Sequence, residues 1–205
     1  MNRFSLITAS LLALGSASAF AGGYVGLGQG ITSSDVASEN RENLGYNKSR
    51  DADTVSGGFK AYGGFTFGNW GVEAAYYDLG NYELKGQVAG VDSRDRFKSN
   101  AVAFSFVGNF KVAEKLKVHG RAGVADVETR YHCYDNCNNR LGDTSKKVFS
   151  PLIGGGFSWE FTPGWALRGD LDIIPLAKSH VGTGGSSYEK TVSYSLLSAN
   201  IEYRF

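Results

Sequence analysis

The chain has 205 residues, of which 28 are glycine and only 3 are proline, a net charge of +1 and a mean hydropathy of −0.22. This composition argues against a disordered or collagen-like chain, and the charge balance gives no bulk attraction to nucleic acid. Past the N-terminus there is no apolar run of about 18 residues, which excludes a helical membrane protein but leaves open a β-barrel, whose strands alternate apolar and polar residues.

The first 21 residues predict a secretory signal. Arg3 gives a basic start, residues 4–14 are mainly apolar, and the small residues that follow contain two overlapping A-x-A cleavage patterns. We expect export through the Sec pathway and cleavage near Phe20 or Gly22, so that residues 1–21 are a signal peptide and residues 22–205 are one outer-membrane β-barrel domain. A membrane-anchoring helix is the alternative, and the short apolar core counts against it.

Eight segments with a period of two residues follow the signal, as expected for β-strands. They span residues 22–32, 57–68, 70–80, 95–112, 115–127, 147–161, 164–176 and 191–205. The seventh shows the pattern best, with Trp165, Leu167, Leu171 and Ile173 on one face and Arg168, Asp170 and Asp172 on the other. The second places Phe59, Ala61, Gly63, Phe65 and Phe67 on one face and Lys60, Tyr62 and Thr66 on the other.

The connections between these segments alternate between long and very short. The short ones lie at Asn69, 113–114 and 162–163, and the long ones at 33–56, 81–94, 128–146 and 177–190. Outer-membrane barrels show this asymmetry. We therefore predict an all-β fold, an eight-stranded antiparallel up-and-down transmembrane β-barrel with short periplasmic turns and four long extracellular loops. In the fourth segment Val102, Phe104 and Phe106 look outward, unless a bulge shifts the register.

Aromatic residues gather near the predicted short-turn end, as in an interfacial girdle: Phe65, Phe67, Trp70, Trp165, Tyr203 and Phe205. The last segment alternates up to a terminal aromatic, with Tyr203 two residues before Phe205. This ending resembles the signature by which outer-membrane proteins are passed to the barrel assembly machinery, which we expect as a partner during biogenesis.

Several segments resemble the transmembrane domain of the OmpA-type barrels: 23–28, 72–80, 119–123 and the closing 203–205. The resemblance implies a charged network inside the barrel, carried here by Glu73, Arg121, Arg168 and Asp170. The basic residue that members can place on the fourth strand has no match, because that stretch reads Phe104-Ser105-Phe106. We therefore favour charge compensation over a salt-bridge gate. Better-known members add a peptidoglycan-binding domain, and we expect none here.

Cys133 and Cys137 lie in the third long connection. In an oxidising periplasm a local disulfide is the default expectation. A metal site with His132 and Asp135 is the alternative, but the spacing matches no structural zinc motif. The glycines at 26–30 and 154–156 lack the strand and helix of a nucleotide-binding loop, and we expect them to make room inside the barrel.

We expect no catalytic residue, cofactor or metal. The predicted function is structural, that of a monomeric envelope protein among outer-membrane lipids and lipopolysaccharide, with at most a very narrow channel, because side chains fill an eight-stranded barrel. One alternative is an adhesin that binds host or surface ligands through its loops, with aromatic anchors at Tyr46, Tyr82, Tyr131 and Tyr134. Another is a lipid A-modifying enzyme, for which His180 beside Ser179 is the one testable pair, although strand neighbours face opposite sides.

Overall fold

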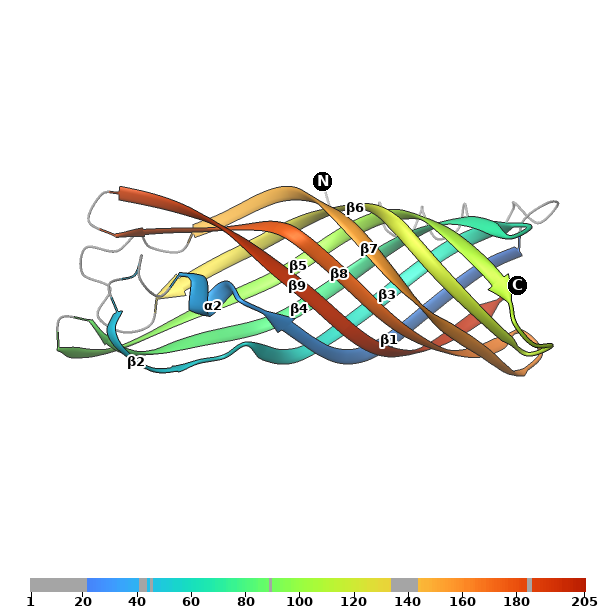
Figure 1. Cartoon of the computed structure of the whole chain (residues 1–205), viewed down its shortest axis with the longest axis horizontal. Helices are drawn as coiled ribbons and strands as arrows, with labels where there is room; N and C mark the ends of the chain where they lie inside the picture. The colour runs from blue at the N-terminus through green and yellow to red at the C-terminus, as the bar shows by residue number, and fades with distance from the viewer. Residues whose placement is uncertain (1–21, 41–43, 45, 89, 134–143, 184–185) are drawn as a thin grey trace, which may run out of the picture.

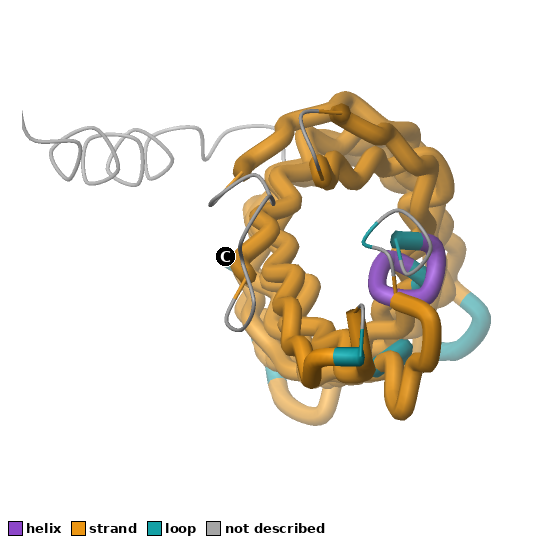
Figure 2. Tube along the Cα trace, turned by 90° about the vertical axis from the view of Figure 1, so that its left-hand side faces the viewer, coloured by secondary structure: helices purple, strands orange, loops and turns teal. Residues whose placement is uncertain are grey.

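The computed structural model describes residues 22–40, 44, 46–88, 90–133, 144–183 and 186–205, and the predicted signal peptide lies outside them. Within these residues a long strand wall closes on itself (Figures 1 and 2). Its elements in chain order are β1 (Gly22–Ser34), α2 (Val36–Glu39), β2 (Tyr46–Ala52), β3 (Val55–Phe67), β4 (Trp70–Val88), β5 (Val91–Lys111), β6 (Leu116–Cys133), β7 (Thr144–Thr162), β8 (Trp165–Thr183) and β9 (Ser186–Arg204).

The fold is the predicted eight-stranded antiparallel up-and-down barrel. The sheet order is β2-β4-β3-β1-β9-β8-β7-β6-β5, and the pairing of β4 with β5 closes the ring. The first and last strands pair from Tyr24↔Arg204 to Ser34↔Tyr194. At the end of this seam, the amide of Gly23 donates to the Phe205 carbonyl oxygen at 3.1 Å, and the Phe205 amide donates back at 2.9 Å. The start of β1 and the end of β9 therefore meet at the short-turn end (Figure 1).

The strands extend well beyond the predicted boundaries at the long-connection end. β4 and β5 pair as far as Val88↔Val91, and β8 and β9 as far as Thr183↔Ser186, through stretches that the sequence marks as connections. β6 likewise continues to Cys133. These stretches are polar because the paired strands there extend into water, and not because the backbone is irregular.

The face of the wall that carries the apolar side chains changes from the outside to the inside along the barrel. Near the short turns the exterior is apolar, with Val102, Phe104 and Phe106 exposed as predicted. In the extended part the interior is apolar instead, because Tyr82, Phe97 and other large side chains are buried there. The same holds for Tyr131, so neither tyrosine is the loop anchor that an adhesin would use. The strand pairing around Val102 is regular, and the one register shift between β4 and β5 lies between Asp78 and Asn81.

The first long connection contains additional structure. α2 lies at the mouth of the barrel (Figure 2), where Val36 and Ala37 are completely buried and α2 contacts β4, β5 and β9. The Asp35 carboxylate before α2 accepts a hydrogen bond of 2.8 Å from the Ser193 amide on β9. β2 then pairs with the far end of β4, where β3 no longer reaches. No helix among the described residues is long and apolar enough to span a membrane.

Aromatic side chains surround the short-turn end on the outside. The rings of Trp165 and Tyr203 lie 4.9 Å apart, and those of Tyr203 and Phe205 lie 6.3 Å apart. Other exposed members of this group are Phe67, Trp70, Trp159 and Phe161. Such rings suit a membrane interface, where one part of the ring meets hydrocarbon and another meets headgroups.

Candidate functional site

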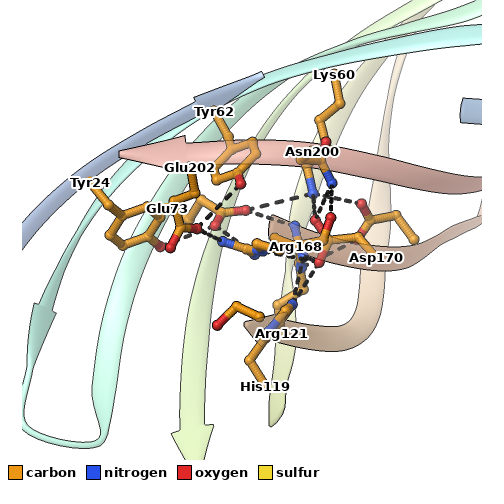
Figure 3. A network of polar contacts seen from close by, with 12 residues as sticks. Tyr24, Lys60, Tyr62, Glu73, His119, Arg121, Arg168, Asp170, Asn200 and Glu202 are labelled. Carbon is orange, nitrogen blue, oxygen red and sulfur yellow. Dashed lines mark hydrogen bonds and ion pairs between the residues drawn. The ribbon is translucent and has the colours of Figure 1, made fainter. Parts of the chain in front are cut away.

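A network of charged side chains fills the barrel interior near the short-turn end (Figure 3). Its seven members come from five strands, and the period-two geometry turns each of them inward. They are Lys60 on β3, Glu73 on β4, Arg121 on β6, Arg168, Asp170 and Asp172 on β8, and Glu202 on β9. All seven are buried. Charges removed from water need partners, so the contacts between them decide what the site does.

Arg168 uses all three guanidinium nitrogens. Its Nη1 lies 2.9 Å from Glu202 Oε2, its Nη2 lies 2.9 Å from Glu73 Oε2, and its Nε lies 3.1 Å from Asp170 Oδ1. The guanidinium also lies 4.6 Å from the centre of the Tyr62 ring. Arg168 therefore joins three carboxylates from three strands.

Arg121 and Lys60 complete the cationic part of the network. Arg121 Nη1 lies 2.7 Å from Glu73 Oε1, and its Nη2 lies 2.5 Å from Asp170 Oδ1. Lys60 Nζ lies 2.8 Å from Asp172 Oδ2 and 3.0 Å from Asp170 Oδ2. Asp170 is consequently the common acceptor of all three cations.

Neutral groups satisfy much of the remaining hydrogen-bonding capacity. The hydroxyl of Tyr24 donates to Glu73 at 3.0 Å, and that of Tyr62 donates to Glu202 at 3.2 Å. Asn200 Nδ2 donates to Asp170 at 3.2 Å, and His119 Nε2 lies 2.6 Å from the other Asp170 oxygen. The network is therefore well packed with partners, as a buried ionic cluster must be.

Glycine makes room for these side chains. A Cβ atom on Gly154 would collide with the Asp172 carboxylate, and one on Gly156 would collide with the backbone of β8 and approach Asp170. A larger residue at either position would displace the network. The sequence-based expectation that residues 154–156 provide interior space is confirmed at these two positions.

The structure brings together the four residues predicted to form the network, Glu73, Arg121, Arg168 and Asp170, and it adds three charged residues that the prediction left out. Lys60, Asp172 and Glu202 pair with them inside the barrel. Their signal was present in the alternation, which placed Lys60 and Asp172 on the polar faces of their strands. Lys60 on β3 supplies a third cation. The position where other family members can have a basic residue is occupied here by Ser105 on β5.

The network lies across the interior of the barrel. Three cations face four carboxylates, and Arg204 neutralises Glu202 further with a contact of 2.7 Å at the short-turn side. The cavity between the network and this mouth measures about 80 Å³ and is lined by Lys117, Ser158 and Arg204 among others. This space is large enough for water molecules.

Other predicted site residues stand apart from the network. Tyr203 and Phe205 are exposed on the exterior of the barrel. Cys133 ends β6, and Cys137 lies outside the described residues, so the disulfide stays a prediction. His180 and Ser179 are consecutive residues of β8. Over the described part of the chain, no group of three or more His, Cys, Asp and Glu side chains is arranged to hold a metal ion.

A second charge cluster lies on the outside of the wall, beyond the apolar band. Arg94 Nη2 on β5 lies 2.7 Å from Glu83 on β4, and Arg96 Nη2 lies 2.6 Å from the same carboxylate. The hydrogen bonds from the two guanidinium groups lower the pKa of Glu83 to about 2. The cluster links β4 and β5 where both strands stand in water.

We expect this outer cluster to stabilise the β4–β5 hairpin in a pH-dependent way. The contribution of Glu83 is complete above the pKa of an unpaired glutamate, about 4.3, and it is lost as the pH falls from there through the folded value of about 2. An NMR titration of the Glu83 carboxyl carbon in micelles measures this directly. In Arg94→Gln with Arg96→Gln the titration should return toward 4.3; a wild-type midpoint already near that value contradicts the pairing.

The comparisons place this architecture among known membrane barrels. The family model described as the OmpA-like transmembrane domain matches residues 19–205. No curated protein sequence matches the chain. Among solved structures, OprG from Pseudomonas aeruginosa is similar with a TM-score of 0.62 and 11% identity, covering 91% of this chain and 96% of that one.

Two further structures share the fold at low identity. Neisserial surface protein A aligns with a TM-score of 0.58 and 15% identity, covering 89% of this chain and 97% of that one. Ail of Yersinia pestis, solved in complex with the heparin analogue sucrose octasulfate, aligns with a TM-score of 0.52 and 15% identity over 91% and 99% of the two chains. The family match covers the whole described barrel, and the chain therefore belongs to the OmpA-like transmembrane domain family of the Gram-negative outer membrane.

Proposed function

We propose that this outer-membrane barrel has a structural role in the envelope and conducts no solutes. The observation that carries the proposal is the buried network of Lys60, Glu73, Arg121, Arg168 and Asp170, which ties the four strands β3, β4, β6 and β8 together across the lumen. Moving a solute past it requires that several buried ion pairs be broken at once, and each of these separations is costly in a low dielectric.

A second obstruction supports the same proposal. Toward the long-connection end, the completely buried rings of Tyr77, Tyr82 and Phe97 follow the network inside the barrel, and Tyr194 lies 6.2 Å from Tyr82 between ring centres. Val36 of α2 is buried in the same core cluster. The interior is thus filled by an ionic layer and then by an apolar one, as expected for a barrel of this strand number.

We expect the refolded protein to carry no steady current in a planar bilayer at neutral pH. The measurement is single-channel recording with a large trimeric porin as a positive control in the same membrane. Correct insertion is checked by heat-modifiable migration of the same preparation. A stable current comparable with that of the porin would contradict the structural role.

A surface-interaction role is the second candidate, because the wall extends beyond the apolar band and carries charged residues on its outside. The similar barrel Ail was solved with a heparin analogue bound, so a sulfated glycan is a reasonable first ligand to test. A deletion that shortens the β4–β5 hairpin between residues 86 and 93 leaves the barrel below it intact. Retained insertion with loss of binding to host cells supports this role, and unchanged binding argues against it.

We propose no catalytic role and no cofactor. His119 lies inside the barrel at 2.6 Å from Asp170, away from the lipid boundary where a lipid-modifying enzyme works. We also propose that the exposed Tyr203 and Phe205 at the end of the chain serve as the recognition signal for the barrel assembly machinery. The ring of Tyr203 on β9 and the ring of Phe205 directly after it are both exposed on the outside of the barrel.

A further inference from the structure

The cavity at the periplasmic mouth of the barrel is lined by polar side chains from three consecutive strands. It measures about 80 Å³ and lies between the charged network and the short turns. Its lining includes Asn109 on β5, Lys117 on β6 and Ser158 on β7. Lys117 and Ser158 are direct cross-strand partners. Three groups that can donate hydrogen bonds therefore border one small space.

Two of these donors have no partner in the part of the chain that the structure describes. Asn109 Nδ2 is buried and makes no hydrogen bond with any described residue. Lys117 is partly buried and forms no ion pair with any of them. A buried donor without an acceptor is costly, so such groups call for a ligand or for ordered water.

Arg204 orients the third donor and occupies the nearby carboxylates. Its Nη2 donates to Ser158 Oγ at 2.9 Å, and the hydroxyl keeps one hydrogen that it can donate into the cavity. The other nitrogens of Arg204 lie 2.7 Å from Glu202 and 3.5 Å from Glu160. Both carboxylates thus already have a cation, and Lys117 is the cation at this mouth that has no carboxylate partner among the described residues.

The charge and the size of the cavity suit a small oxyanion. Among the lining residues, the cations Lys117, Arg168 and Arg204 face one carboxylate, that of Glu202. One water needs about 10–15 Å³ of such a space, so a cavity of about 80 Å³ has room for an ion of a few heavy atoms. Phosphate and carboxylate oxygens accept hydrogen bonds from ammonium, amide and hydroxyl groups, which are the donors present here.

We propose that the periplasmic mouth of the barrel is a binding site for one small oxyanion, either a phosphate or a carboxylate group. Lys117 Nζ supplies the charge, and Asn109 Nδ2 and the Ser158 hydroxyl supply two further hydrogen bonds. The oxyanion gives the two unpartnered donors their acceptors. The site lies on the periplasmic side of the charged network and does not depend on a closed lumen, so its failure would leave the proposed structural role untouched.

The site is tested by NMR titration of the full mature protein refolded in detergent micelles. Chloride is replaced stepwise by inorganic phosphate or by acetate, at constant pH and ionic strength. We expect saturable shifts of the backbone amides of Lys117 and Ser158 and of the side-chain amide of Asn109. In Lys117→Gln the affinity should fall roughly 10-fold, as expected for the loss of a hydrogen bond to a charged group. Asn109→Leu keeps the approximate size of the side chain without its donor and should weaken binding roughly 5-fold.

Lys111→Gln is the matched control. Lys111 on β5 is the direct cross-strand partner of Lys117 and carries the same charge, but it is exposed and does not line the cavity. Its substitution should leave the affinity at the wild-type value. Folding of every variant is checked by heat-modifiable migration, and Asn109→Leu carries the test if Lys117→Gln does not fold.

Each outcome decides for or against the site. Saturable shifts with phosphate or acetate that weaken in Lys117→Gln and persist in Lys111→Gln support it, and the anion that binds more tightly identifies which of the two groups the site takes. If neither anion saturates the shifts, the cavity holds water alone and the proposal is wrong. Wild-type affinity in Lys117→Gln refutes it too, and an equal loss in Lys111→Gln would reveal only the overall charge of the mouth.

Discussion

Replacing Arg168 with alanine is expected to destabilise the folded barrel by about 3–5 kcal/mol, the usual cost of leaving buried charges without their partner. Arg168 contacts Glu73, Asp170 and Glu202 from the centre of the network, and its side chain is only 4% exposed. Truncation leaves three buried carboxylates with fewer cations and no access to bulk water. The stability is measured as the urea midpoint in phospholipid vesicles, followed by tryptophan fluorescence.

The matched control for this prediction is Arg130→Ala. Arg130 also forms an ion pair, with Glu128 at 2.8 Å, but its side chain is 58% exposed on the outside of the wall. Exposed pairs of this kind contribute about 0–1 kcal/mol. If Arg168→Ala shifts the midpoint no more than Arg130→Ala does, the interior pairing has no structural importance and the proposed role loses its main support.

Removing the cation of β3 should also have a large effect, and a second substitution should partly reverse it. Lys60→Met leaves Asp172 without its contact of 2.8 Å and is expected to cost about 3 kcal/mol or more. Asp172→Asn alone should destabilise as well, because Lys60 and Arg121 then share fewer carboxylates. In the double variant the two losses should not add, with a coupling of about 1–3 kcal/mol between directly contacting residues.

This cycle tests a contact that the sequence analysis missed. Strictly additive losses would show that Lys60 and Asp172 are each held by other partners, such as Asp170 and Arg121, and that their own contact is incidental. Tyr62 provides a check on packing, because Lys60 Nζ lies 5.0 Å from the centre of its ring. Tyr62→Phe keeps this ring and should change the midpoint far less than Lys60→Met.

The sequence predicts the barrel and which residues face inward or outward, because a strand in hydrocarbon must alternate between apolar side chains toward lipid and polar side chains toward the lumen. Alternation places Arg168 and Asp170 on one face of their strand and the apolar residues on the other, and the family resemblance implies that the charged face points inward. This alternation no longer applies where the wall extends beyond the membrane. At Tyr82 and Phe97 the apolar side chains face inward and the charged neighbours face outward. With the pattern expected inside a membrane those stretches resemble loops, so the predicted strands are too short at the long-connection end.

The partners within the network are harder to predict than its inward faces. Glu202 and Arg168 face each other because β8 and β9 are adjacent in one register, with Arg168 paired to Asn200. Lys60 meets Asp170 from β3, across the lumen and 110 residues away in the chain. Each strand shows only which residues point inward. Which cation meets which carboxylate depends on the stagger of all the strands together, and no single segment carries that information.

The seam between β1 and β9 has a consequence for how the protein enters the membrane. The two strands that seal the ring are the first and the last strands of the barrel, and they are joined residue by residue from Tyr24 to Ser34. Any shorter nascent fragment has two open edges, whose bare amides and carbonyls hydrocarbon does not tolerate. The wall therefore lacks an open edge in hydrocarbon only once β1 and β9 have paired.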